Sequence, residues 1–196
     1  ERTKANGISM DTLPRRYTNM SLVGHTSKIY YPQIANKTGK EMQMKDILVL
    51  GIGNLVLRDE GVGIHAVDYL QKQNLPANID LLDGGTGGIA LIGILQEYRR
   101  VILIDATLDN NPPGTIRHLR PQYSQDYPPL LSAHEIGLKE MIDAMMIQER
   151  IPEIDLIAIS VACVKEVGMH LSPDVARVIP EIGEKVCQLI NSYIKS

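Results

Sequence analysis

Four side chains of the types that bind metals or transfer protons follow the predicted strands of this sequence. Glu60 comes shortly after the apolar run 47–51, and Asp83 and Asp105 directly follow two later apolar runs. His134 opens the helical segment that follows the next predicted strand. Ligands of open α/β sheets bind beyond the carboxyl ends of the strands, so one crevice is expected to gather Glu60, Asp105 and His134, with Asp83 nearby.

Two carboxylates and one imidazole form a donor set of intermediate hardness, which suits nickel, zinc, iron or manganese better than Cu(I). Each side chain also has a simpler interpretation. An Asp at a strand end often makes a turn, a Glu near a helix start interacts favourably with the helix dipole, and a His in a first helical turn is often a surface residue. Spacing alone leaves both interpretations open.

The elements that must position these residues are short strands alternating with amphipathic helices. Apolar runs predict strands at 47–51, 79–82, 101–104, 115–119 and 154–161. Helices are predicted from 62, over 89–98, from Ser132 and from Ser172, the last with a bend at Pro180. This order predicts a three-layer α/β/α sandwich around a mostly parallel, twisted sheet of about five strands.

Composition narrows the class of protein. The chain has 196 residues, of which 44 % are apolar and 22 % charged, as in ordinary globular domains. Its two cysteines cannot form a disulfide framework, so a cytoplasmic location is expected. The longest apolar runs are too short for membrane insertion, and a net charge of −3 argues against nucleic acid as a partner.

Charge divides the chain into two parts. Residues 1–43 carry seven Lys/Arg and three Asp/Glu, whereas residues 44–196 carry 13 basic and 20 acidic residues. The first part lacks a periodic apolar stretch, so we interpret it as a poorly structured basic extension, with the natural start expected at Met44. A functional basic arm is the alternative. Residues 44–196 are expected to form a single α/β domain.

Several familiar catalytic motifs are incomplete. The segment 61–66 matches the dinucleotide pattern G-x-G-x-x-A, but it starts ten residues after the strand ends and cannot form the tight phosphate-binding turn. His134-Glu135 lacks the second His of a zinc-protease motif, and no serine-nucleophile elbow or phosphate loop is present. A Cys such as Cys163, at the end of an apolar strand, is more often an inert buried thiol than a nucleophile.

The ordered set of motifs from residue 45 to 194 resembles the nickel–iron hydrogenase maturation endopeptidases. No single motif is diagnostic, but their order and spacing also fit. The motifs are ILVLGIGN (47–54), DEGVG (59–63), DGGTGG (83–88), VILIDA (101–106), PG (113–114), SAHEIGL (132–138) and GMHLSPDV (168–175).

The resemblance implies an enzyme that removes the C-terminal extension of the hydrogenase large-subunit precursor after nickel insertion, with the substrate's nickel as the recognition signal. It implies Glu60, Asp105 and His134 as metal contacts, with zinc or cadmium as substitutes for nickel, and Asp83 as a fourth functional residue. Glycines 84, 85, 87 and 88 would let the peptide backbone approach closely. Residues 162–166 lack the Pro-Glu pair that many relatives carry there, which leaves the hydrogenase subclass open.

Two other functions remain as alternatives. The first is a non-catalytic α/β module that binds the precursor or a metal without cleaving anything. The second is a nucleotide-binding enzyme, which rests only on the displaced glycine motif.

Overall fold

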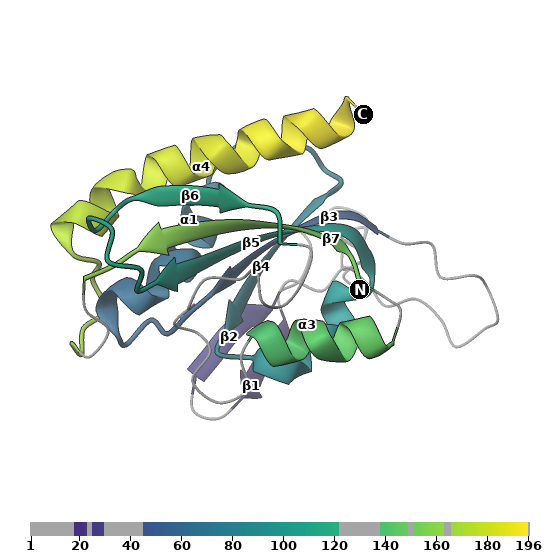
Figure 1. Ribbon diagram of the computed structural model, residues 1–196, viewed down its shortest axis with the longest axis horizontal. Helices are drawn as coiled ribbons and strands as arrows, with labels where there is room; N and C mark the ends of the chain where they lie inside the picture. Colours follow the sequence, from purple (N-terminus) through teal and green to yellow (C-terminus); the bar gives the residue numbers. More distant parts are fainter. Residues whose placement is uncertain are drawn as a thin grey trace, which may run out of the picture.

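The computed structural model describes residues 18–22, 25–29, 45–121, 138–148, 151–162 and 166–195. Five strands form one sheet in the order β4-β3-β5-β7-β6 (Figure 1). All neighbouring pairs are parallel except β6 with β7, which places the one antiparallel strand at an edge. The bounds are β3 (Lys45–Ile52), β4 (Ile79–Gly85), β5 (Tyr98–Thr107), β6 (Ile116–Leu119) and β7 (Glu153–Ser160).

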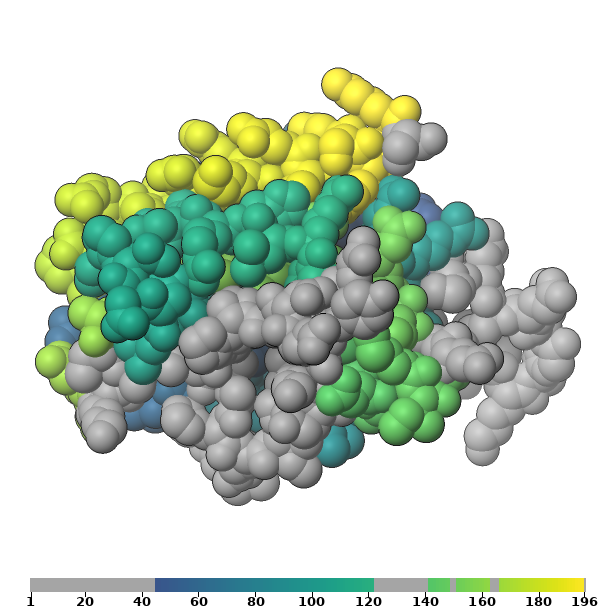
Figure 2. All heavy atoms as spheres, in the orientation of Figure 1, coloured from purple at the N-terminus to yellow at the C-terminus, as the bar shows by residue number. Residues whose placement is uncertain are grey.

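Helices cover both faces of this sheet and confirm the predicted three-layer architecture. One face packs against α1 (Val62–Leu70) and α4 (Pro173–Ile194). The other packs against η3 (Gly88–Leu91), α2 (Ile92–Leu95) and α3 (Leu138–Ile147). In Figure 1, α4 and α3 lie on opposite sides of the strands. Figure 2 shows α4 along one flank of the molecule, with the side chains of β6 at the surface beside it.

Strand interiors are almost wholly apolar, because parallel strands are buried on both faces. Alternate residues of each strand contribute to two separate cores, as side chains on a strand point alternately to opposite faces. Leu48, Leu50 and Leu103 belong to the core under α3, whereas Val49 and Ile102 belong to the core under α1 and α4. The continuous apolar runs of the sequence therefore correspond to the central strands.

The predicted helix over 89–98 is wrong at its end. The helical part stops at Leu95, and β5 begins at Tyr98. The Tyr98 side chain is buried, its hydroxyl donates a hydrogen bond to Asp80 Oδ2 at 2.7 Å, and Lys45 Nζ lies 4.9 Å from the ring centroid. These contacts with two other strands outweigh the local helical pattern.

Two further features differ from or add to the sequence-based expectations. Helix α4 continues through Pro180 to Ile194. Two short strands that were not predicted, β1 (Thr18–Leu22) and β2 (His25–Ile29), pair as an antiparallel hairpin within the basic extension, and β2 contacts β4. The division into residues 1–43 and 44–196 stays a prediction. None of the helices in the described segments is long and apolar enough to cross a membrane.

A buried carboxylate holds the C-terminal end of α4 on the sheet. Asp155, near the start of β7, accepts a hydrogen bond from Arg120 Nε at 2.8 Å and also contacts His118 and the Tyr193 hydroxyl. Arg100 lies over the Tyr193 ring, 4.5 Å from its centroid. Buried charge is tolerated where it is paired, so this cluster fixes α4 at the amino-terminal edge of the sheet.

The backbone at the start of α1 lies so close to the sheet that no side chain fits between them. A β-carbon built on Gly63 would lie 2.3 Å from the carbonyl oxygen of Ile104 and 2.5 Å from that of Ile52. One built on Gly51 would lie 2.1 Å from the carbonyl oxygen of Gly63. These two glycines therefore let the helix backbone touch the ends of β3 and β5. Gly63, one of the two glycines of the dinucleotide-like motif at 61–66, is thus used for helix–sheet packing.

We predict that Gly63→Ala destabilises the fold by at least roughly 1–3 kcal/mol, because the added methyl group meets backbone atoms that cannot rotate away. Gly93→Ala is the matched control, since a β-carbon there has no atom within 4 Å and alanine favours helix. Urea denaturation of the two variants measures the difference. Equal stability of both would show that the close approach at Gly63 is not a constraint.

Candidate active site

The carboxyl ends of β3, β4, β5 and β7 meet at one edge of the sheet. In Figure 1 the arrowheads of β5 and β7 point toward the end of the molecule at which α4 begins. The pairing of strands places Asp83 of β4, Gly51 of β3 and Ile104 of β5 in one row across the sheet. Asp105 is one residue further along β5, so the pairing of strands places two of the four predicted residues, Asp83 and Asp105, at this edge.

Glu60 lies in η2 (Arg58–Gly61), the single 3₁₀ turn that leads directly into α1. This residue is only 2 % exposed, and η2 contacts β5. The Gly53 backbone, at φ 145°, passes so near that a β-carbon there would lie 1.9 Å from the Glu60 carbonyl oxygen. Glu60 is therefore held against the ends of β3 and β5 rather than in solvent.

Asp105 is fully buried near the end of β5. Its Oδ1 accepts a hydrogen bond from the backbone N–H of Ala106 at 2.7 Å. The preceding residue, Ile104, is the one whose carbonyl oxygen contacts Gly63, and Glu60 lies three residues before Gly63. The close packing of α1 thus brings two buried carboxylates, Glu60 and Asp105, to neighbouring parts of the same edge.

Asp83 belongs to the same edge but to the opposite face of the sheet. It lies in the same row of the sheet as Ile104, which packs under α1 and α4. Asp105 lies two residues after Leu103 on β5 and so faces the same side of the sheet as Leu103, which packs under α2 and α3. Asp83 Oδ1 accepts a hydrogen bond from Gly85 N–H at 2.9 Å, and burial raises the pKa of this carboxyl group. The pairing of strands therefore does not group Asp83 with Asp105.

His134 lies outside the described residues. Helix α3, which starts at Leu138, packs on the same face of the sheet as Leu103, with which Asp105 is in phase. Within the described segments, no group of three or more His, Cys, Asp or Glu side chains is arranged to hold a metal ion. The described chain thus contains two of the three predicted ligands, and the set as a whole stays a prediction. Cys163 also lies outside the described segments.

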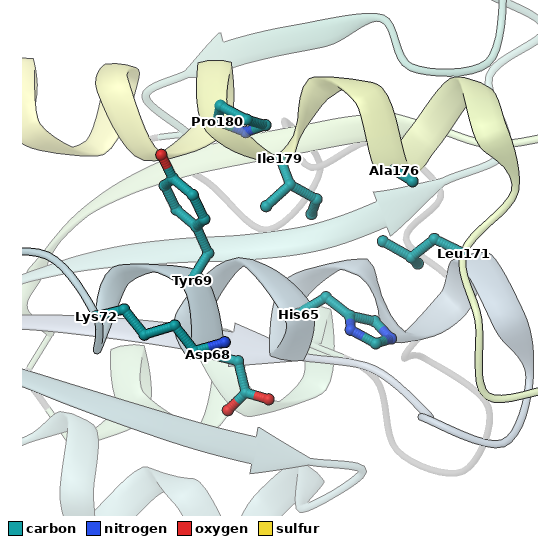
Figure 3. A pocket seen from close by; sticks show the side chains of 8 residues that line it. All are labelled: His65, Asp68, Tyr69, Lys72, Leu171, Ala176, Ile179 and Pro180. Carbon is teal, nitrogen blue, oxygen red and sulfur yellow. The ribbon is translucent and has the colours of Figure 1, made fainter.

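A separate cavity of about 380 Å³ lies between α1 and α4 (Figure 3). His65, Asp68, Tyr69 and Lys72 line it from or next to α1, and apolar side chains line it from the segment that begins at Leu171. Burial lowers the pKa of His65, which also hydrogen-bonds the backbone of Met169. None of the described site residues, Glu60, Asp83 and Asp105, lines this cavity, so we do not assign it to the same site.

The raised pKa of Asp83 makes stability depend on pH. The folded state holds the proton more tightly than the unfolded state, so this group's contribution is fully present below the unfolded pKa and is lost as the pH rises through the folded pKa. Asp83→Asn cannot ionise, and its amide oxygen can still accept the Gly85 hydrogen bond. We predict that this variant gains stability over the wild type between pH 4 and pH 7, as measured by urea denaturation. A difference that does not change with pH would contradict this.

Comparison with known proteins identifies the family of this chain. Residues 64–189 match the family model described as hydrogenase maturation protease. The chain is 33 % identical over 153 residues to the hydrogenase expression/formation protein HupD of Bradyrhizobium diazoefficiens, covering 75 % of this chain and 79 % of that protein. It is 36 % identical over 113 residues to the hydrogenase 2 maturation protease of Escherichia coli, covering 55 % and 67 %.

Solved structures show the same relationship. The hydrogenase-maturating endopeptidase HybD of Escherichia coli superposes with a TM-score of 0.68 at 30 % identity, over 75 % of this chain and 93 % of that one. The [NiFe] hydrogenase maturation protease HybD of Thermococcus kodakarensis superposes with a TM-score of 0.60 at 26 % identity, over 74 % and 98 %. The family match, the curated relatives and the shared α/β fold together place this chain in the hydrogenase maturation protease family, and it is a peptidase of that family.

Proposed function

We propose that this protein removes the C-terminal extension of a nickel–iron hydrogenase large-subunit precursor after nickel insertion, and that it recognises the nickel carried by that precursor. Membership of the maturation protease family supports the class of reaction. The observation that carries the finer proposal is the burial of two carboxylates, Glu60 and Asp105, at one edge of the sheet. The low cysteine content is in keeping with a reaction in the cytoplasm.

The electrostatics of this edge favour a cation. Two carboxylates brought together in a buried place repel when both are ionised, and a divalent ion between them replaces that repulsion with attraction. Carboxylate oxygens and an imidazole nitrogen together suit nickel, and also zinc or cadmium in its place. We assign Glu60, Asp105 and His134 as the groups that complete the coordination of the substrate's nickel.

The hydrolytic step proposed here uses the same arrangement. The nickel that the precursor presents would supply Lewis-acid chemistry at the scissile carbonyl or at an attacking water. The role of Glu60, Asp105 and His134 is to fix the position of that ion against the peptide. Gly85, the last residue of β4, and Gly88, the first of η3, adopt φ values of 51° and 47°, which favour glycine, and we propose that they let the substrate backbone approach closely. β-Carbons built on Gly84 and Gly87 would instead meet Leu50 and Leu91 within the fold. Asp83 stays a candidate for a fourth functional role at this rim.

We predict that the purified protein shortens a nickel-loaded precursor and leaves the metal-free precursor intact, as followed by mass spectrometry of both products. Each of the variants Glu60→Gln, Asp105→Asn and His134→Ala should lower the cleavage rate by at least about 100-fold. The loss of a metal ligand should reduce activity at least as much as the loss of a group that hydrogen-bonds to a ligand, which lowers activity by up to about 100-fold. Thermal unfolding of each variant shows whether the fold survives.

The matched control is Glu153→Gln, which removes a carboxylate whose side chain is 72 % exposed at the opposite edge of the sheet. It should cleave like the wild type. Cleavage of the metal-free precursor at an equal rate would exclude nickel as the signal. Stable binding of the loaded precursor without shortening would favour the non-catalytic module instead.

A further inference from the structure

Asp59, which precedes Glu60 in η2, is also a buried acidic residue. Asp59 is 5 % exposed, and its Oδ1 accepts a hydrogen bond from the backbone N–H of Ser172 at 2.6 Å. Ser172 is the residue that precedes α4, and its own side chain makes no capping hydrogen bond. The carboxylate of Asp59 therefore serves as an acceptor for the start of a 22-residue helix, where negative charge is also favourable.

The residues just before Asp59 are joined to the same part of the chain. Arg58 N–H donates to the Gly168 carbonyl at 2.8 Å, and Gly168 N–H donates to the Val56 carbonyl at 2.9 Å. Arg58 also forms an ion pair with Glu166. The segment 166–172 thus lies along the segment 56–59 and holds it by backbone as well as side-chain contacts.

Local structure alone does not hold Glu60 in place. η2 is a single 3₁₀ turn without a side-chain cap, and 3₁₀ turns have poor hydrogen-bond geometry. Arg58 has a φ of 45°, which is rare for a residue other than glycine and persists only where surrounding contacts hold it. The orientation of Glu60 must therefore depend on contacts that η2 makes with other elements.

We propose that Asp59 is a positioning residue that keeps the Glu60 carboxylate in its ion-binding orientation by anchoring η2 to the residue before α4. The proposal rests on the function proposed above. In this proposal Asp59 acts without direct contact with the ion or the peptide. It acts through the hydrogen bond to Ser172, which joins residues 113 positions apart in the sequence.

The first test compares Asp59→Ala with Asp59→Asn in cleavage of the nickel-loaded precursor. Asp59→Ala removes the acceptor and should lower kcat by roughly 10- to 100-fold, since even a small misplacement of a group that positions the reacting centre lowers the rate. Asp59→Asn keeps an acceptor oxygen for the Ser172 N–H and should recover most of the lost rate. A loss in Asp59→Asn equal to that in Asp59→Ala would overturn the proposal.

The second test removes the same hydrogen bond from its other end. Ser172→Pro lacks the donor N–H, while the observed φ of −60° at this residue suits proline. It should reproduce the kcat loss of Asp59→Ala, and the double variant should be no worse than either single one. Additive losses in the double variant would show that the two residues act separately. Ser172→Pro also keeps the proposal testable if Asp59→Ala does not fold.

Asp174→Ala is the matched control for a general effect on α4. It removes another carboxylate from the first turn of the same helix, but its side chain is 58 % exposed and pairs with Arg177 rather than with η2. We expect its kcat to match that of the wild type. A kcat loss in Asp174→Ala as large as that in Asp59→Ala would mean that helix stability, not the anchoring of η2, explains the result.

Amide hydrogen exchange separates this proposal from the proposed function. The amides of residues 56–61 should exchange faster in Asp59→Ala and Ser172→Pro than in the wild type. Their exchange rates in Asp174→Ala should equal those of the wild type. Unchanged exchange in Asp59→Ala would overturn the anchoring role whatever the activity. If the wild type does not shorten the loaded precursor, the proposed function fails, while the exchange data still decide whether Asp59 holds η2.

Discussion

The contact between Gly63 and the carbonyl oxygen of Ile104 is the constraint on which the rest of the site depends. At a distance where a β-carbon would overlap the oxygen, α1 rests directly on the ends of β3 and β5. Glu60 precedes this contact by three residues, and Asp105 follows Ile104 in the chain. A helix that started farther from the sheet would separate the two buried acidic residues.

Helix α4 is fixed at both ends by carboxylates that belong to other elements. Asp59 accepts a hydrogen bond from the residue before the helix, and Asp155 contacts Tyr193 in its last turn. Between these ends the helix buries Val175, Ile182 and Val186 against the sheet. The same helix that covers one core therefore supports the segment that carries Glu60, which couples the stability of the fold to the geometry of the site.

Buried acidic residues lie at both edges of the sheet. At the amino-terminal edge, Asp155 is surrounded by His118, Arg120 and Tyr193, so its charge is neutralised within the protein. At the carboxyl-terminal edge, Asp59, Glu60 and Asp105 are all buried acidic residues. Natural proteins often accept a cost in stability where a ligand or substrate must bind, and the burial of acidic residues at this edge is in keeping with the site proposed there.

The sequence by itself determined the fold class and the candidate carboxylates. The runs 47–51, 101–104 and 154–161 are apolar throughout because strands buried on both faces need no alternation, and the polar residues that end them mark the edge of the sheet. Only the tertiary structure decided where β5 begins, since Tyr98 is held by Asp80 and Lys45 from other strands.

The relative placement of the acidic residues also required the tertiary structure. The pairing of strands puts Asp83 in phase with one core and Asp105 with the other, and strand register is not visible in a single sequence. The partnership of Asp59 with Ser172 joins two segments that local patterns treat as unrelated. Local propensity reports what a segment can form, whereas contacts between distant segments depend on how the layers pack.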